Sequence, residues 1–218
     1  FLMCSDCNSD VSYFQFIEVS CAEVREVINK LRNSKSRDVY GFSVEIIKTI
    51  KDIILSPLTK LINTCIKSCT FPDCLKVANV IPILKKGDPS DSSNYRPISL
   101  LPIFSKILEK ILMVQLSGYF EKHNLICSNQ FGFRSGLNTS KAVIDLVDEI
   151  TDCFHEGTYA TTSFLVLTKA FNCVCHSLLP WKLYFYNLHP ESVRFISSYL
   201  GNRIQKVTMG ETSSSYLP

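Results

Sequence analysis

The amino-acid sequence lacks several features that would assign it to well-defined classes of protein. No apolar run approaches the ~20 residues that a membrane-spanning helix needs. The N-terminal stretch FLMCSDCNSD has no basic region followed by an apolar one, so no secretory signal peptide is indicated. There is also no internal repeat, low-complexity tract or linker. We therefore expect an intracellular protein of the nucleus or cytoplasm, not a secreted or membrane protein.

The chain also lacks a strong excess of charge. Its net charge is +3, and charged residues make up 20% of the 218 residues against 46% hydrophobic ones. This composition is that of a globular chain, long enough for one large domain or two small ones. The mild positive charge permits a nucleic-acid partner but does not by itself indicate one.

The ten cysteines do not form a recognisable metal or disulfide framework. Cys4 and Cys7 have metal-ligand spacing, but no second pair follows at a finger distance. Cys173, Cys175 and His176 lack an evident fourth ligand, so we interpret them as two packed thiols and a histidine at the start of a helix. In a chain without a secretory signal, scattered cysteines are typical of small buried residues, and we expect this of Cys65, Cys69, Cys74 and Cys173.

Hydrophobic periodicity predicts mostly helices, with a β-hairpin and a small antiparallel sheet. Ser20 and Glu23 form a capping-box pattern at the start of the first helix. Pro57 is expected to separate the second helix from the third. Pro82 and Pro97 should confine the two hairpin strands to edges or bulges. The predicted helices cover 20–32, 44–54, 58–69, 105–122, 139–154, a stretch from 177, and 190–200; the predicted strands cover 76–86, 95–101, 163–167 and 203–209.

This segregated order of helices and strands indicates the α+β class. Within it, Lys85 and Lys86 lie near the predicted hairpin tip, with Arg96 across the turn. Two or three cations there suit a triphosphate or a nucleic-acid backbone. The alternative is a solvated turn with ordinary surface charge.

Two further groups of residues could contact nucleic acid. The stretch QFGFRSG (130–136) combines two phenylalanines, Arg134 and flexible backbone, which suits contact with a nucleotide or strand. Its alternative is a loop anchored by buried phenylalanine. Arg203 and Lys206 add positive charge to the last predicted strand. None of these features is specific in isolation, but their order along the chain is.

In that order the sequence resembles the reverse transcriptase domain of a non-LTR (LINE-type, jockey-like) retrotransposon. The resemblance covers nearly the whole chain, and GDPSDSSNYRPISLL followed by QFGFR is its most specific part. The matching stretches are SKSRDVYGFS (34–43), FPDCLKVANVIPILKKGDPSDSSNYRPISLLPIFSKILEK (71–110), NQFGFRSGLNTSKAV (129–143), FLVLTKAFNCVCHSLL (164–179) and SYLGNRIQKV (198–207).

The resemblance implies the fingers and part of the palm of a right-hand polymerase. It divides the chain into a helical lead-in (1–78), a fingers-like region with the hairpin (79–140) and a partial palm (141–218). In the family, the partners are an RNA template and a DNA primer, and the cofactor is Mg²⁺. The residues that it implies for dNTP binding are Lys85, Lys86, Arg96, Arg134, Lys169, Ala170 and Phe171, with Phe171 as the gate against ribonucleotides.

One position departs from the family pattern at its most critical point. In this register the family motif reads F-L-D-L-S-K-A-F-D, and its first Asp is a magnesium ligand. The present chain has Val166 there and Asn172 at the second Asp. Two-metal phosphoryl transfer needs hard oxygen ligands, which an isopropyl group does not offer. We therefore expect no intact catalytic residue and no bound metal cofactor in this chain.

The resemblance also implies a truncated chain, which stops before the Gly-rich loop, the paired-Asp hairpin and the thumb. Three interpretations follow. The first is a decayed polymerase fragment without activity. The second is a module that retains weak affinity for RNA or template–primer. The third is a relic that keeps only the fold.

Overall fold

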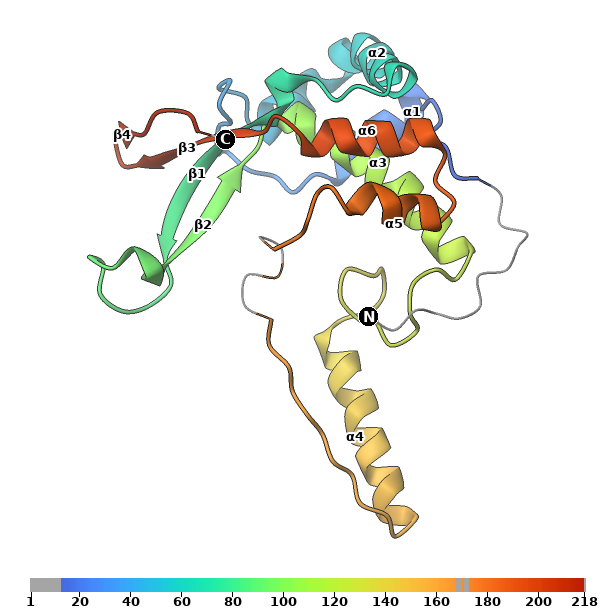
Figure 1. Cartoon of the computed structure of the whole chain (residues 1–218). Helices are drawn as coiled ribbons and strands as arrows, with labels where there is room; N and C mark the ends of the chain where they lie inside the picture. Colours follow the sequence, from blue (N-terminus) through green and yellow to red (C-terminus); the bar gives the residue numbers. More distant parts are fainter. Residues whose placement is uncertain (1–12, 168–169, 171–172, 218) are drawn as a thin grey trace. The chain divides into compact units, whose positions relative to one another are not determined.

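The computed structural model describes residues 13–167, 170 and 173–217 (Figure 1). These residues form helices and a small sheet, which confirms the α+β class. The helices are α1 (Cys21–Lys30), α2 (Val44–Ser68), α3 (Ile103–Lys122), α4 (Thr139–His155), α5 (Leu179–Phe185) and α6 (Pro190–Leu200), with short 3₁₀ turns at Asp73–Lys76 and Ser92–Asn94. The strands are β1 (Val77–Leu84), β2 (Tyr95–Leu100), β3 (Ile204–Met209) and β4 (Thr212–Ser213).

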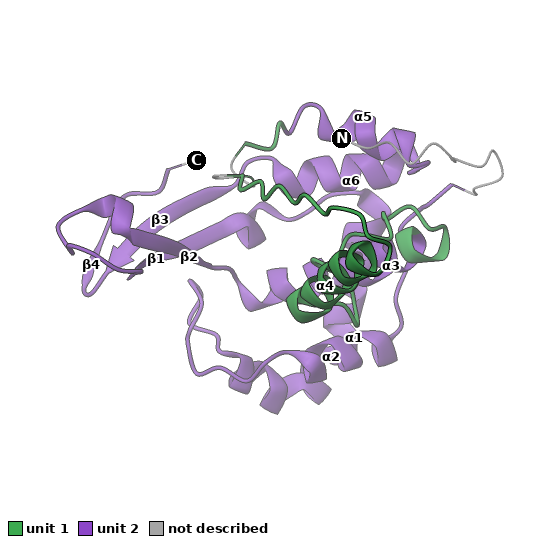
Figure 2. Cartoon of the chain, turned by 90° about the horizontal axis from the view of Figure 1, so that it is seen from below, with its two compact units in different colours: residues 1–10, 120–175 green, residues 11–119, 176–218 purple. Residues whose placement is uncertain are grey.

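The chain divides into two compact units, coloured separately in Figure 2. Unit 1 comprises residues 1–10 and 120–175, and unit 2 comprises residues 11–119 and 176–218. These units are defined by internal contacts. The boundaries of the lead-in, fingers and palm remain a prediction.

The first helix begins as its sequence predicts. The Ser20 hydroxyl accepts a hydrogen bond from the Glu23 N–H, and the Glu23 carboxylate accepts one from the Ser20 N–H, so the capping box is complete. Val24 and Ile28, one turn apart on α1, are fully buried. The helix is therefore fixed at its start by local hydrogen bonds and along its length by burial.

The expected break at Pro57 is absent, and α2 is one helix of 25 residues. Proline inside a helix removes one backbone hydrogen bond and costs ~3 kcal/mol. On both sides of Pro57, however, side chains of α2 enter the core, including Leu55, Leu58 and Ile62. Burial of a continuous apolar stripe offsets the lost bond. The prediction of two separate helices over 44–54 and 58–69 was wrong.

The sheet is mixed, whereas the sequence predicted an antiparallel one. Its strand order is β2-β1-β3-β4. β1 pairs antiparallel with β2 as the expected hairpin, but it pairs parallel with β3 from Val77↔Ile204 to Val80↔Val207. The chain between β1 and β3 includes several helices, and such a crossover permits parallel pairing of distant strands.

The core of unit 2 forms around an extended segment, residues 14–19, which has no neighbouring strand along most of its length. Asn63 of α2 holds Val19 by two hydrogen bonds: the Val19 N–H donates to Asn63 Oδ1 at 2.8 Å, and Asn63 Nδ2 donates to the Val19 carbonyl at 2.9 Å. Gln115 of α3 makes the same pair of bonds with Ile17. The Phe16 N–H donates to the hydroxyl of Ser192, a buried residue of α6. One segment thus links three helices.

Aromatic side chains then fill the space beside this segment. Phe16 packs edge-on against Phe14 and against Phe195, with ring centroids 4.9 and 5.7 Å apart. Phe71 and Phe195 are almost fully buried. Because residues 14–19 carry both the hydrogen bonds and two of these rings, the packing of α2, α3 and α6 depends on them.

Of the two predictions about residues 163–179, the strand was wrong, and the helix is confirmed with a start two residues later. The stretch 163–167 is not a strand, since none of the described residues pairs with it. An extended segment without a partner cannot satisfy its peptide groups as a strand does. The helix expected from residue 177 begins at Leu179, with Pro180 in its first turn.

The cysteines also differ from expectation. Eight of them lie in the described part of the chain, and none of the eight forms a disulfide with another described cysteine. Cys69 is buried as predicted and Cys65 is half-buried, but Cys74, Cys173 and Cys175 are exposed. Cys4 and Cys7 lie outside the described residues. None of the helices described in the structure is long and apolar enough to cross a lipid bilayer.

The two hydrogen bonds between Asn63 and Val19 give a direct test of this fold. Asn63→Ala leaves a buried residue's N–H and C=O without partners, and we expect the free energy of unfolding to fall by about 1–3 kcal/mol. Asn29→Ala is the matched control, because Asn29 is exposed and only accepts a hydrogen bond from Lys51. It should change stability by less than about 0.5 kcal/mol. Equal losses in chemical denaturation would contradict the role given to Asn63.

Candidate functional site

The β1–β2 hairpin is a regular ladder in which two prolines face each other. Pro82 of β1 lies opposite Pro97 of β2. Residues in a non-hydrogen-bonded pair of an antiparallel ladder direct their N–H groups away from the partner strand, so two prolines fit there. β2 is an edge strand, and β3 pairs with β1 only up to Val80. Both prolines therefore meet the edge condition that the sequence predicted.

The tip of the hairpin is fixed by hydrogen bonds within the loop. The Lys85 N–H donates to the Asn94 carbonyl at 2.8 Å, which extends the ladder beyond Leu84. Asn94 Nδ2 donates to the Asp88 carbonyl, and the Tyr95 hydroxyl donates to the Pro89 carbonyl. Gly87 has φ +92°, and a Cβ there would lie 2.7 Å from the Asn94 side chain. The loop at Gly87 thus requires glycine.

This ladder brings two of the predicted site residues to one face of the hairpin. Arg96 lies opposite Ile83. Lys85 follows Ile83 by two residues, so it projects to the same face as Ile83 and Arg96. Lys85, Lys86 and Arg96 are all exposed, and none of them forms an ion pair with a described residue.

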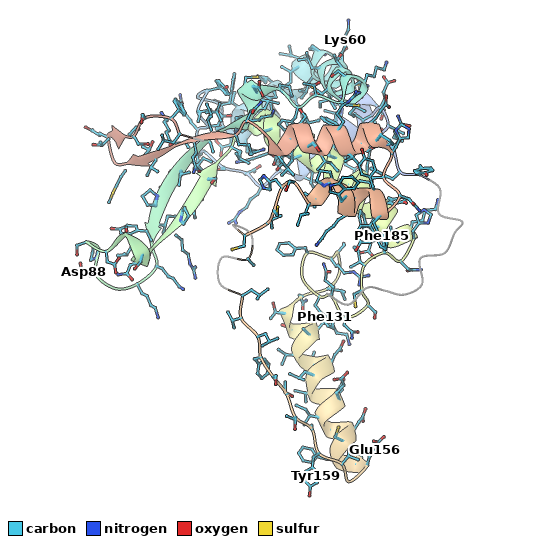
Figure 3. All side chains as sticks on the ribbon, viewed as in Figure 1. Lys60, Asp88, Phe131, Glu156, Tyr159 and Phe185 are labelled. Carbon is cyan, nitrogen blue, oxygen red and sulfur yellow. The ribbon has the colours of Figure 1, made fainter. Side chains whose placement is uncertain are left out.

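Two carboxylates in the same loop moderate this positive charge. Asp88, labelled at the tip in Figure 3, accepts a hydrogen bond from the Ser90 N–H, and Asp91 accepts one from the Ser93 N–H. These bonds lower the pKa of both carboxyls, so both are ionised at neutral pH. Three cations and two carboxylates leave a net charge of +1 on the hairpin tip.

Arg134 belongs to unit 1, whereas the hairpin belongs to unit 2. Its guanidinium forms a two-point contact with Glu121 at the end of α3, with Nε–Oε1 and Nη2–Oε2 distances of 3.1 and 2.9 Å. Nη1 donates to the Cys127 carbonyl at 3.1 Å. The pKa of Glu121 is lowered by the hydrogen bonds from Arg134. Arg134 therefore holds the loop 121–134 closed, and a planar guanidinium suits this contact better than lysine.

The phenylalanines of QFGFRSG do not anchor this loop by burial. The Phe133 side chain is 94% exposed and its backbone has φ +62°, while Phe131 is half-buried. A left-handed conformation is uncommon for a bulky residue. The alternative of a loop anchored by buried phenylalanine is therefore wrong for Phe133.

The stretch that matches the metal motif is exposed where the structure describes it. Val166 is 87% exposed and Ala170 is also exposed. Lys169, Phe171 and Asn172 lie outside the described residues, so their predicted roles are not tested. Within 13–167, 170 and 173–217, no group of three or more His, Cys, Asp and Glu side chains is placed to hold a metal ion.

Sequence reasoning missed a polar cluster beside an apolar cavity of about 590 Å³ in unit 2. Burial raises the pKa of Glu109, which accepts a hydrogen bond from the Ser105 hydroxyl at 2.9 Å. Arg203 lies 3.9 Å from Glu109, donates to the Tyr199 carbonyl and stacks 4.7 Å above the Tyr199 ring. The Arg203 side chain is thus bonded within the fold. Glu109, which is half-buried on the inner face of α3, is the residue that could have pointed to this cluster.

Comparisons with known proteins agree with the order of motifs. Residues 83–217 match the family model described as reverse transcriptase (RNA-dependent DNA polymerase). The chain is 30% identical over 198 residues to the RNA-directed DNA polymerase from mobile element jockey of Drosophila funebris, and 29% identical over 201 residues to that of Drosophila melanogaster. These alignments cover 90% and 92% of this chain and 22% of each relative.

A more distant relative is the retrovirus-related Pol polyprotein from type-1 retrotransposable element R1 of Bradysia coprophila. It is 29% identical over 122 residues, which is 55% of this chain and 12% of the relative. The chain therefore spans about a fifth of the length of the two jockey relatives, and less of this one.

The contact between Arg134 and Glu121 predicts a measurable titration. Because the folded-state pKa of Glu121 is lowered, its contribution to stability is present above the unfolded pKa and lost as pH falls through the folded pKa. In a carboxyl-detected NMR titration, Arg134→Gln should return the pKa of Glu121 toward its ordinary value. Arg134→Lys keeps the charge but not the two-point contact, so it should give an intermediate value. An unchanged Glu121 titration in Arg134→Gln would contradict this assignment.

Proposed function

The chain belongs to the reverse transcriptase (RNA-dependent DNA polymerase) family, and from this premise we propose that it is a non-catalytic part of a non-LTR retrotransposon polymerase. In this proposal the region 79–140 corresponds to the fingers and 141–218 to part of the palm. The β1–β2 hairpin would supply the phosphate-binding surface, through Lys85, Lys86 and Arg96. Arg134 would act by fixing the loop 121–134.

One residue carries the proposal that the chain does not polymerise. Val166 stands where the family motif has a magnesium-binding Asp. When bound, the metal pair of such enzymes holds and polarises the phosphates of the incoming nucleotide. A valine side chain has no lone pair to offer a hard cation, so the residue present at this position does not fit Mg²⁺. No step of a polymerisation reaction is therefore assigned to this chain.

The second candidate function is binding of RNA or template–primer without catalysis. It is favoured by Lys85 and Arg96, two exposed cations on one face of a hairpin whose loop is fixed by its own hydrogen bonds. A pre-ordered loop loses little entropy when a phosphate binds. The carboxylates of Asp88 and Asp91 keep the expected affinity low.

Primer extension tests the absence of catalysis. With a primed RNA template, dNTPs and Mg²⁺, the chain should give no incorporation above a magnesium-free blank, because the position of the family Asp offers no ligand. The variant Val166→Asp, assayed in parallel, shows whether this residue is the sole obstacle. Magnesium-dependent incorporation by the unchanged chain would contradict the proposal.

A filter-retention assay tests the binding surface. If three cations contact phosphates, the logarithm of the affinity for single-stranded RNA should fall with the logarithm of salt concentration with a slope of about −2. Lys85→Glu or Arg96→Glu should weaken binding to all RNA sequences and reduce that slope by about one. Lys60→Glu is the matched control, since Lys60 is an exposed cation of α2 away from the hairpin (Figure 3). If Lys60→Glu weakened RNA binding as much as Lys85→Glu and Arg96→Glu, the attraction would be unspecific and the hairpin would not be the binding surface.

A further inference from the structure

The β1–β2 hairpin is held to the rest of unit 2 mainly at its base. No helix in the described part of the chain makes extensive backbone contact with β1 or β2, and Figure 1 shows the hairpin extending away from the helices. β3 pairs with β1 only from Val77 to Val80, and β2 lies at the edge of the described sheet beside β1. The direction of the hairpin tip therefore depends on how the chain is fixed just before β1 and just after β2.

A short loop, residues 38–42, binds the chain at both of these points. The Tyr40 hydroxyl donates a hydrogen bond to the carbonyl of Cys74, which lies in the 3₁₀ turn directly before β1. Asp38 Oδ2 accepts a hydrogen bond from the Ile103 N–H at 2.8 Å. Ile103 is the first residue of α3, three positions after the end of β2. Loop 38–42 is thus bonded to the segment that enters the hairpin and to the segment that leaves it.

The Asp38 carboxylate also shapes the loop itself. Its Oδ1 accepts hydrogen bonds from the N–H groups of Tyr40 and Phe42, both at 3.0 Å. One oxygen therefore closes the loop, while the other holds the start of α3. An ionised carboxylate suits both tasks, because both of its oxygens accept hydrogen bonds and neither donates one.

The loop has a firm support of its own at the start of α2. It continues directly into Ser43, a buried residue whose hydroxyl caps that helix. Phe42 packs edge-on against Phe104 of α3, with ring centroids 5.7 Å apart, and Ile103 is 2% exposed. The N–H groups in the first turn of a helix have no partner within it, and here a loop residue supplies one. Loop 38–42 therefore joins the base of the hairpin to the buried starts of two helices.

We propose that Asp38 is a positioning residue for the hairpin: with Tyr40, it fixes the direction in which Lys85 and Arg96 are presented to a phosphate backbone. The phosphate contact rests on the function proposed above, whereas the fixing of the hairpin does not. A hairpin that pivots at its base presents its cations over a range of directions. The cost of ordering them is then paid on binding, and fewer of them meet one backbone at the same time.

A positioning role differs from general stabilisation in where the loss of Asp38 is felt. Loss of a contact that only positions the hairpin increases local opening of β1 and β2. Loss of a contact that supports the whole fold increases opening of the core helices as well. Amide hydrogen exchange measures both kinds of opening in the same sample.

Asp38→Asn separates the two tasks of the carboxylate. The asparagine keeps an acceptor oxygen for Tyr40 and Phe42, but its NH₂ group cannot accept the hydrogen bond from Ile103. In the whole 218-residue chain, the amides of β1 and β2 should exchange about tenfold faster, since a hydrogen bond to a charged group is lost. The amides of α1 should exchange at an unchanged rate. Tyr40→Phe loses only the bond to the Cys74 carbonyl and should accelerate exchange less, at the start of β1.

Retention of single-stranded RNA gives a second readout, with a matched control for charge. Removal of a carboxylate by itself strengthens the attraction of RNA. Glu149→Gln removes one from an exposed position of α4 that takes no part in these contacts, so it should not weaken retention. Asp38→Asn should weaken retention about threefold despite the same change in charge, and it should make the dependence on salt less steep.

Three results would overturn the positioning role. One is exchange of the hairpin amides in Asp38→Asn that matches the unchanged chain, or that rises no more than exchange in α1. The second is RNA affinity that rises in Asp38→Asn as it does in Glu149→Gln, while Lys85→Glu lowers it. If Asp38→Asn does not fold, unchanged exchange of β1 in Tyr40→Phe is the third. An RNA affinity that Lys85→Glu leaves unchanged contradicts the proposed function instead, and hydrogen exchange then still decides whether Asp38 fixes the hairpin.

Discussion

The peptide groups of residues 14–19 have no neighbouring strand along most of their length, and side chains take its place. Asn63, Gln115 and Ser192 reach this segment from α2, α3 and α6 and supply the hydrogen bonds that a sheet would otherwise provide. Buried peptide groups must be paired, so the segment can pack with Phe14, Phe16 and Val19 buried only because these three residues supply partners. Its two phenylalanines then fill the space beside it. This segment therefore ties α2, α3 and α6 of unit 2 to one another.

The β1–β2 hairpin shows how peptide groups are accommodated at the edge of the sheet. Its two prolines lie opposite each other where neither strand needs the N–H group that proline lacks. The loop beyond them closes on its own side chains through Asn94 and Tyr95. Three cations are therefore held on a pre-ordered support, although the carboxylates of Asp88 and Asp91 cancel much of their field. In the proposed function, this balance suits weak and reversible contact with phosphate.

Local signals were read correctly from the sequence, and signals that depend on distant residues were not. The capping box at Ser20 and the hairpin with its edge prolines involve residues close in sequence, and the structure confirms them. The continuity of α2 through Pro57 depends on burial against other elements, and the parallel pairing of β1 with β3 joins residues more than 120 positions apart. At the candidate site, the hairpin pattern correctly predicted that Lys85 and Arg96 lie near each other. No pattern in the neighbouring sequence predicted that Arg134 would bind the carboxylate of Glu121. Family membership was recognisable because it rests on the order of motifs and not on their packing.

Val166 has a consequence beyond metal chemistry. In the family motif an acidic residue interrupts this apolar run, and a charge within such a run opposes aggregation as well as binding a cation. With valine there, residues 157–168 carry no charge at all. Under the proposed function, the loss of a metal ligand at residue 166 would therefore also lengthen the uncharged segment that contains it. In that proposal, a carboxylate at this position would serve both as a metal ligand and as a charge that keeps the exposed apolar run from aggregating.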